Sequence, residues 1–191
     1  MYAPKALLRI VAVTGMPGAG KSTASEALVK LGWHRVVMGD VIRKETKRRG
    51  LHPDAKNTGE VMRSLREEHG ESAVADLCLE EIRSSKSDRV VIDGIRSMVE
   101  VQTFRKKAPV ILVAVHASPE RRFELLKERG RSDDPLSRES FARRDERELG
   151  VGIGNAIALA DEVISNERSS PAKLATSMVE VVDRWMKSVD S

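Results

Sequence analysis

Short apolar runs alternate with amphipathic stretches along almost the whole chain. The apolar runs are rich in β-branched residues and too short for helices, so they predict buried strands at residues 7–14, 34–38, 89–93, 110–116 and 162–165. Between them apolar residues recur at helical spacing, which predicts helices at residues 21–31, 41–49, 58–68, 71–84, 98–106, 119–129, 137–149 and 172–188. Strands that alternate with helices form βαβ units, so the predicted fold class is α/β with a buried, mainly parallel sheet.

Two stretches interrupt this alternation. The first places predicted helices and the polar residues 50–57 between the second and third predicted strands, and the second is a break near Gly130 with many arginines around it. Insertions of this kind usually carry substrates or act as lids. The length of 191 residues fits one medium domain, so we expect a single domain over residues 1–191.

The composition is that of a globular protein, with 40% hydrophobic and 32% charged residues. No apolar run approaches the roughly 20 residues that span a bilayer, and we find no signal-peptide cleavage site, so we expect a cytoplasmic protein with no membrane partner. Cys78 is the one cysteine, which excludes a disulfide framework and a cysteine zinc site. The net charge is +4, but the few aromatic residues are scattered, so we do not expect a nucleic-acid partner. No motif bears on the oligomeric state.

The first predicted strand leads directly into a complete G-x-x-x-x-G-K-S motif, which a predicted helix follows. Glycines let such a loop wrap closely, so that backbone N–H groups and the helix N-terminus converge on a phosphate. Lys21 adds a positive charge at the β- and γ-phosphates, and the Ser22 hydroxyl suits Mg²⁺. The predicted nucleotide-binding residues of this segment are Gly15, Met16, Pro17, Gly18, Ala19, Gly20, Lys21, Ser22 and Thr23.

A loop of this type indicates a nucleoside triphosphate but not a reaction. GTPases carry an Asn/Thr-Lys-x-Asp motif after a strand. The nearest match, at residues 85–88, begins with serine and precedes a predicted strand. We therefore do not expect a GTPase.

Three further motifs place arginine near the ends of predicted elements. Asp40 is expected to cap the helix that follows it, which sets Arg43 one turn along on the same face. Asp93 ends a predicted parallel strand, at the sheet edge where ligands bind, and Arg96 follows it closely. The third motif spans residues 127–134 and leads into a segment dense in arginine, where acidic residues balance the basic ones. The placement of individual guanidinium groups must therefore matter there.

Together these motifs resemble those of the P-loop nucleoside monophosphate kinases, such as adenylate kinase, and in particular the uncharacterised adenylate-kinase-like proteins of archaea, over nearly the whole chain. The resemblance implies a P-loop NTPase three-layer sandwich with a five-stranded, mainly parallel sheet. It implies a helical acceptor-binding insertion at residues 41–70 and a short lid at residues 129–136. It also implies ATP and Mg²⁺ as cofactors and a small phosphorylated acceptor, most simply a nucleoside monophosphate.

The resemblance also implies roles for residues of the acceptor and metal sites. Asp40 and Arg43 match the family's Gly-Asp-x-x-Arg, whose arginine grips the acceptor phosphate. Arg96 is expected to be a second clamp on that phosphate, although the segment from Asp93 to Arg96 is one residue shorter than the family's Asp-Gly-Phe-Pro-Arg. Ser22 and Asp93 are expected to hold Mg²⁺.

Catalysis in this family relies on positive charges that close over the transferring phosphoryl group. Lys21, Arg131 and Arg143 are the expected catalytic residues here, and Arg129 is expected at the nucleotide. The spacing after Arg131 differs slightly from that of adenylate kinase. The alternatives for the second lid arginine are Arg138 and Arg144.

Two other functions remain open. Dephospho-coenzyme A kinases share the fold and an Ala-Asp-x-Val-Ile-x-Asn ending, which residues 160–166 match, but they do not normally carry the motif that ends in Arg43. An ATP-dependent regulatory or RNA-associated NTPase is an alternative of another class, in which the basic residues 43–49 would contact a phosphate backbone.

Overall fold

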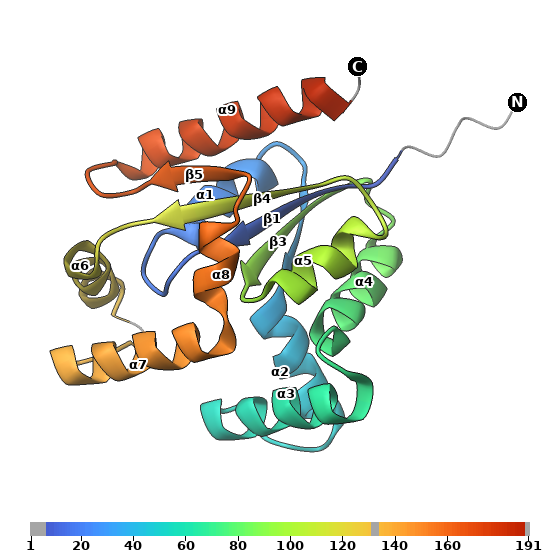
Figure 1. Ribbon diagram of the computed structural model, residues 1–191, viewed down its shortest axis with the longest axis vertical. Helices are drawn as coiled ribbons and strands as arrows, with labels where there is room; N and C mark the ends of the chain where they lie inside the picture. The colour runs from blue at the N-terminus through green and yellow to red at the C-terminus, as the bar shows by residue number, and fades with distance from the viewer. Residues whose placement is uncertain (1–6, 131–133, 190–191) are drawn as a thin grey trace, which may run out of the picture.

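The computed structural model describes residues 7–130 and 134–189, and it contains one five-stranded sheet. All neighbouring strands in it are parallel, in the order β2-β3-β1-β4-β5 (Figure 1). The strands are β1 (Arg9–Thr14), β2 (His34–Val37), β3 (Arg89–Ile95), β4 (Val110–His116) and β5 (Glu162–Ser165). The predicted α/β fold with a parallel sheet is confirmed, and the apolar runs are its strands because a sheet covered on both faces needs apolar residues on both.

Helices cover both faces of the sheet and make three layers (Figure 1). The described helices are α1 (Lys21–Val29), α2 (Met38–Arg48), α3 (Ala55–His69), α4 (Ala73–Ser85), α5 (Met98–Arg105), α6 (Pro119–Arg129), α7 (Arg138–Val151), α8 (Ile153–Ala158) and α9 (Pro171–Val189).

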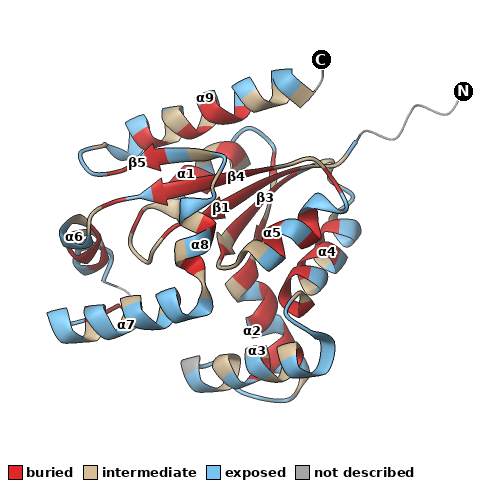
Figure 2. Ribbon diagram, in the orientation of Figure 1, coloured by how far each residue is buried: buried red, intermediate tan, exposed pale blue. Residues whose placement is uncertain are grey.

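Alternate residues of β1 divide the hydrophobic core into two clusters, because successive side chains of a strand point to opposite faces. Ile10 and Ala12 pack in one cluster with buried residues of α2, α4 and α5. Val11 and Val13 pack in the other with α1 and α9. Figure 2 shows these buried residues along the strands and the inner faces of the helices, whereas α7 is mostly exposed.

The loop after β1 and the end of β3 meet at one edge of the sheet. Asp93 of β3 lies opposite Val13 in the strand register. The register then shifts, so that Thr14 lies opposite Ile95 and its hydroxyl donates a hydrogen bond to the Ile95 carbonyl oxygen at 2.9 Å. Gly94 takes up the shift with φ +103°. The start of the phosphate loop is thereby fixed against the residues that follow Asp93.

Two helices, α2 and α3, occupy the insertion predicted at residues 41–70. Helix α2 begins at Met38, before the predicted start at residue 41. Helix α3 begins after Asp54, whose carboxylate accepts a hydrogen bond from the Asn57 backbone N–H at 2.8 Å. This cap extends α3 over polar residues that the apolar pattern left as a loop. The role of these helices in binding an acceptor stays a prediction.

After the predicted lid the chain forms α7, as expected, and then α8, which the sequence pattern did not predict. Gly152, with φ +103°, ends α7 and precedes α8. Glycines at positions 150, 152 and 154 obscure the helical periodicity here, since glycine weakens a helix. Residues 131–133 of the predicted lid lie outside the described residues. Among the helices that the structure describes, none has the length and apolar character needed to cross a membrane.

Candidate active site

The phosphate loop joins β1 to α1, and its glycines are required by close packing. Gly15 has φ +141°, and a Cβ atom there would lie 2.3 Å from the Val115 carbonyl oxygen. Gly18 has φ +83°, and a Cβ atom would lie 2.7 Å from the Arg122 carbonyl oxygen on α6. Side chains would therefore push the loop away from β4 and α6.

Lys21, the first residue of α1, folds back over the loop. Its ammonium group donates hydrogen bonds to the carbonyl oxygens of Gly15 at 2.7 Å and Met16 at 3.2 Å. Removal of the amine from water lowers the pKa of Lys21 to about 8, while the charges of Asp93 and Glu148 act in the opposite direction. A phosphate here would restore the stabilisation that water gives the charged amine.

Ser22 and Asp93 meet as predicted between α1 and β3. The Asp93 carboxylate is buried, and its Oδ2 atom accepts a hydrogen bond from the Ser22 hydroxyl at 3.2 Å. A hydroxyl and a carboxylate are the hard oxygen donors that Mg²⁺ prefers, so these residues fit the ion. The same Oδ2 atom also accepts a hydrogen bond from Arg35 Nη2 at 2.6 Å. Sequence reasoning missed Arg35, although an arginine inside an apolar strand was a signal that could have been followed.

Asp40 and Arg43 form an ion pair instead of a cap and a free cation. Helix α2 begins at Met38 with Val37 before it, so Asp40 lies within the first turn and the expected side-chain cap is wrong. Arg43 Nε donates to Asp40 Oδ1 at 3.0 Å, and the two side chains are 51% and 53% exposed. Both are accessible to a ligand that could separate them.

Arg96 connects the end of β3 to two helices. Its Nε atom lies 2.9 Å from Glu148 Oε2 on α7, and its Nη1 atom lies 4.0 Å from Met62 Sδ on α3. The Arg96 backbone N–H donates to Glu100 Oε2 at 2.8 Å. The charge of Arg96 also lowers the pKa of Lys21, so the shorter motif still leaves this guanidinium group within electrostatic reach of the loop lysine.

The structure distinguishes the three candidates for the second lid arginine. Arg143 is exposed, on the face of α7 opposite Asp145 and Glu148. Arg138 forms an ion pair with Glu120 and lies over the Phe123 ring, 4.3 Å from its centroid. Arg144 is half-buried, and its charge lowers the pKa of Lys21. Of these three arginines, Arg144 is the one whose charge reaches Lys21, and the catalytic role of Arg143 stays a prediction.

Arg129 of the predicted lid shares an acidic partner, Asp134, with Arg144. Arg129 Nε donates to Asp134 Oδ2 at 2.9 Å, and Arg144 Nη1 lies 3.5 Å from Asp134 Oδ1. Asp134 is buried and forms ion pairs with both guanidinium groups. Arg131, a predicted catalytic residue, lies outside the described residues, so its role stays a prediction.

Two further residues that hold the loop were not predicted as site residues. Arg122 of α6 is buried, donates to the Pro17 carbonyl oxygen at 3.1 Å and pairs with Asp145 of α7 at 2.5 Å. Asn166, after β5, is also buried and donates to the Ala19 carbonyl oxygen at 3.0 Å. Asn166 ends the 160–166 motif, so its position was a signal, whereas Arg122 stands in an ordinary amphipathic helix.

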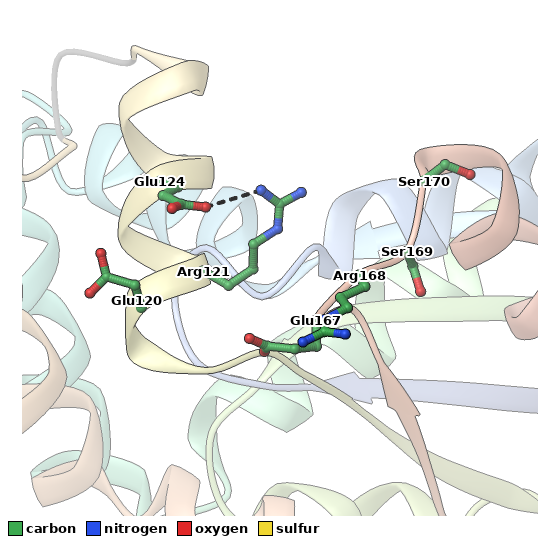
Figure 3. Close-up of a pocket in the computed structure, with 7 residues that line it drawn as sticks. All are labelled: Glu120, Arg121, Glu124, Glu167, Arg168, Ser169 and Ser170. Atoms are coloured by element: carbon green, nitrogen blue, oxygen red, sulfur yellow. Dashed lines mark hydrogen bonds and ion pairs between the residues drawn. The ribbon is translucent and has the colours of Figure 1, made fainter.

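A pocket of about 330 Å³ lies beside the loop between α6 and the turn after β5 (Figure 3). On the α6 side, Arg121 Nη1 lies 3.2 Å from Glu124 Oε2. Across the pocket, Glu167 accepts hydrogen bonds from the backbone N–H and hydroxyl of Ser118, each at 2.7 Å. The remaining lining residues are Glu120, Arg168, Ser169 and Ser170.

Residues 14–142 match the family model of the AAA domain. A UPF0200 protein of Methanocaldococcus jannaschii is 51% identical over 162 residues, which cover 84% of this chain and 82% of that relative. A UPF0200 protein of Thermococcus gammatolerans is 47% identical over 184 residues, which cover 93% of this chain and 97% of the relative.

Two solved structures show the same arrangement of elements. A Thermus thermophilus protein, TT1252, aligns with a TM-score of 0.66 at 19% identity, over 93% of this chain and 98% of its own. Shikimate kinase from Acinetobacter baumannii, solved with shikimate, aligns with a TM-score of 0.57 at 17% identity, over 93% of this chain and 94% of its own. These likenesses show a P-loop kinase-like fold.

Proposed function

This chain belongs to the UPF0200 family and contains its P-loop kinase-like AAA domain, and from this we propose that it is an ATP-dependent kinase of a small phosphorylated molecule, most simply a nucleoside monophosphate. The observation that carries the proposal is Lys21 folded back over the phosphate loop beside the hydrogen bond between Ser22 and Asp93. The charges of Arg96 and Arg144 reach the Lys21 amine and lower its pKa. Phosphoryl transfer depends on positioning and on positive charge around the phosphates, which this arrangement supplies.

Each charged group has a place in the proposed reaction. Lys21 would exchange the Gly15 carbonyl oxygen for the β- and γ-phosphates of ATP, which the loop N–H groups and helix α1 also bind. Ser22 and Asp93 would hold Mg²⁺, which supplies further neutralisation of phosphate charge. Arg144, together with Arg131, would stabilise the charge on the γ-phosphoryl oxygens. The pocket in Figure 3 is our candidate for the base of ATP.

The acceptor would lie between α2, α3 and the end of β3. Arg43 would separate from Asp40, and Arg96 from Glu148. Both guanidinium groups would then bind the acceptor phosphate, which could accept bidentate hydrogen bonds from each of them. The acceptor oxygen attacks the γ-phosphorus atom, and the bond from that atom to the β-phosphate oxygen breaks. A phosphate acceptor is already ionised near neutral pH, so no protein base is required.

A dephospho-coenzyme A kinase is the second candidate, and one observation favours it. Each proposed acceptor arginine already has a carboxylate partner, Asp40 on Arg43 and Glu148 on Arg96. A hydroxyl acceptor loses a proton when it attacks phosphorus, and a carboxylate within hydrogen-bond reach can take that proton. A site lined by paired carboxylates and guanidinium groups therefore also fits a ribose hydroxyl.

An ADP-release assay with AMP, CMP, UMP and dephospho-coenzyme A in turn tests both candidates. We expect one of the monophosphates to accelerate ADP release and to become phosphorylated, with Lys21→Met as the inactive control. Arg43→Ala should raise the acceptor KM by about tenfold or more with little change in kcat, since it removes a contact to an unreacting phosphate. Saturation by dephospho-coenzyme A alone would select the second candidate, and no stimulation by any of the four would overturn the kinase proposal.

A further inference from the structure

Arg35 forms an ion pair with Asp93, the carboxylate of the proposed metal site. It lies on β2 (sequence HRVV), two residues before Val37, which stands opposite Asp93 in the register of β2 and β3. Its side chain reaches along the sheet edge and is 24% exposed, while that of Asp93 is 6% exposed. The pair is therefore largely shielded from water, where an ion pair is stronger than at the surface.

The contact falls on the oxygen atom that a metal ion would need. Asp93 Oδ2 accepts hydrogen bonds from Arg35 Nη2 at 2.6 Å and from the Ser22 hydroxyl at 3.2 Å. Ser22 and Asp93 are the residues to which we assign Mg²⁺, and an ion bound by both would approach this side of the carboxylate. A cation of charge +2 and a guanidinium group repel each other at such a distance.

A second carboxylate, that of Glu26, lies close to the Arg35 guanidinium group. Glu26 lies one turn after Ser22 on α1, which puts the two side chains on the same face of the helix. Glu26 Oε2 already lies 3.5 Å from Arg35 Nη1, and Glu26 is 51% exposed. Ser22, Glu26 and Arg35 line one cavity of about 760 Å³ between α1 and α9, which gives the arginine room to move.

The contacts of Arg35 leave one of its donors unused. Within the residues that the structure describes, Arg35 Nε is buried without a hydrogen-bond partner. A buried donor without a partner has a free-energy cost, which lowers the net stabilisation that the ion pair provides. The guanidinium group is thus held firmly enough to neutralise Asp93 but can be displaced by a stronger cation.

We infer that Arg35 is a resident counter-cation of the metal site: it neutralises Asp93 in the nucleotide-free protein and moves to Glu26 when Mg²⁺ arrives with the nucleotide. Arg35 is then a positioning residue that sets the affinity for the metal. The metal alone must displace Arg35 and binds weakly, whereas the phosphates of the nucleotide supply the additional ligands that make displacement favourable. This inference rests on the proposed nucleotide and Mg²⁺ site but does not depend on the acceptor.

Binding of Mn²⁺, which takes oxygen ligands as Mg²⁺ does, tests the inference without any turnover. The electron paramagnetic resonance signal of free Mn²⁺ reports binding to the full-length chain without nucleotide. Arg35→Met keeps an apolar side chain of similar length and removes the charge, so we expect Mn²⁺ to bind about tenfold more tightly than to the wild type. The matched control is Arg184→Met, which removes an exposed arginine paired with Glu162 at 3.3 Å and should leave Mn²⁺ binding unchanged.

Two further variants test the two halves of the inference. Asp93→Asn added to Arg35→Met should abolish the tight Mn²⁺ site, because the carboxylate is its anionic ligand. Glu26→Gln should weaken Mn²⁺ binding to the wild type by about threefold or more, because the displaced guanidinium group loses its charged partner. Arg35 and Glu26 substitutions thus act in opposite directions, and Glu26 is exposed enough for its variant to fold if Arg35→Met does not.

The inference is overturned if Arg35→Met, folded by circular dichroism, binds Mn²⁺ no more tightly than the wild type, or if Glu26→Gln tightens binding or leaves it unchanged. Its failure is distinguishable from failure of the proposed function. If no acceptor is phosphorylated but the Mn²⁺ affinities shift as expected, the kinase proposal fails and the role of Arg35 stands. If an acceptor is phosphorylated and the affinities do not shift, Arg35 has no role at the metal.

Discussion

Lys21 illustrates how a residue suited to bind phosphate destabilises the protein that carries it. Its amine is removed from water, which lowers its pKa from 10.5 to about 8, although two carbonyl oxygens accept its hydrogen bonds. In the unfolded chain the amine keeps its ordinary pKa. Between pH 8 and 10.5 the unfolded state therefore binds more protons, and stability rises with pH in this window.

Lys21→Met is accordingly expected to stabilise the nucleotide-free protein while it removes nucleotide binding. At pH 7 the charged amine is desolvated only in the folded state, so the variant should be more stable by about 1–2 kcal/mol. The difference in free energy of unfolding between the variant and the wild type should be smaller at pH 9.5, where wild-type Lys21 is mostly neutral. Urea denaturation at the two pH values measures this, and a less stable variant at pH 7 would contradict it.

Arg143 and Arg144 are neighbours in sequence that lie about 100° apart around α7, Arg143 exposed and Arg144 half-buried, which makes them a matched pair. Arg144→Ala is expected to lower kcat by about tenfold or more, because the charge of its guanidinium group reaches Lys21. Arg143→Ala removes an exposed charge from the outer face of α7 and should leave kcat close to the wild-type value. Steady-state kinetics with saturating ATP measure both kcat values. A larger loss of kcat in Arg143→Ala than in Arg144→Ala would show that Arg143 is the second lid arginine.

The site residues that could be predicted from the sequence are those that lie together in one short motif. The loop from Gly15 to Ser22 is contiguous, and its spacing alone indicates its chemistry. Arg35 and Arg122 act on this loop or on its partner Asp93, but Arg35 bonds a residue 58 positions away and Arg122 one 105 positions away. Such contacts depend on strand register and helix packing, which no local pattern encodes.

At the scale of the elements, strands were predicted more closely than helix ends. An apolar run such as β4 is buried along nearly its whole length, so its bounds coincide with the run. Helix ends depend on single residues: Asp54 extends α3 by capping it, and Gly152 separates α7 from α8. The start of α2 at Met38 was not expected, because the preceding apolar residues continue the pattern of β2.

A cluster of charged side chains around Glu45 of α2 connects this helix to α3. Glu45 is buried and accepts hydrogen bonds from Arg48 Nε at 2.6 Å and Arg49 Nε at 2.8 Å. Arg49 also donates to the Ser64 hydroxyl of α3 at 2.9 Å. The hydrogen bond from Arg48 is the largest of the effects that lower the pKa of Glu45 to about 2.

Glu45→Gln should therefore destabilise the protein in a way that depends on pH. The folded pKa lies below the ordinary value of 4.5, so the stabilisation is fully present above about pH 4.5 and is lost as pH falls towards 2. At pH 7 we expect a loss of about 1–2 kcal/mol, since Arg48 is exposed and solvent screens part of the effect. Urea denaturation at pH 7 and pH 3 measures it, and an equal loss at both pH values would contradict the assignment.

At the scale of the whole molecule, α7 joins the phosphate loop to Arg96 at the end of β3, and so the proposed nucleotide side to the proposed acceptor side. Its Asp145 pairs with Arg122, which bonds the Pro17 carbonyl oxygen of the loop. One turn further, its Glu148 pairs with Arg96, which also contacts α3. A shift of α7 would thus move contacts on both sides of the site. We expect such a shift when Arg96 exchanges Glu148 for an acceptor group.

Glu148→Gln separates the two candidate functions because Glu148 has a different role in each. If the acceptor is a monophosphate, Glu148 competes with the acceptor phosphate for Arg96, so its neutral variant should lower the acceptor KM by about threefold or more with kcat preserved. If the acceptor is a hydroxyl and Glu148 takes its proton, the variant should instead lose about a hundredfold or more in kcat.

Glu146→Gln provides the matched control for this test, because Glu146 is exposed on α7, on a face other than that of Glu148. Its kinetics should equal those of the wild type with either acceptor. The proposal of a monophosphate kinase predicts that Glu148→Gln binds AMP more tightly by isothermal titration, in the absence of ATP as well. Unchanged AMP binding in this variant would mean that Arg96 does not meet the acceptor phosphate, and α7 would then lose its proposed link to the acceptor side.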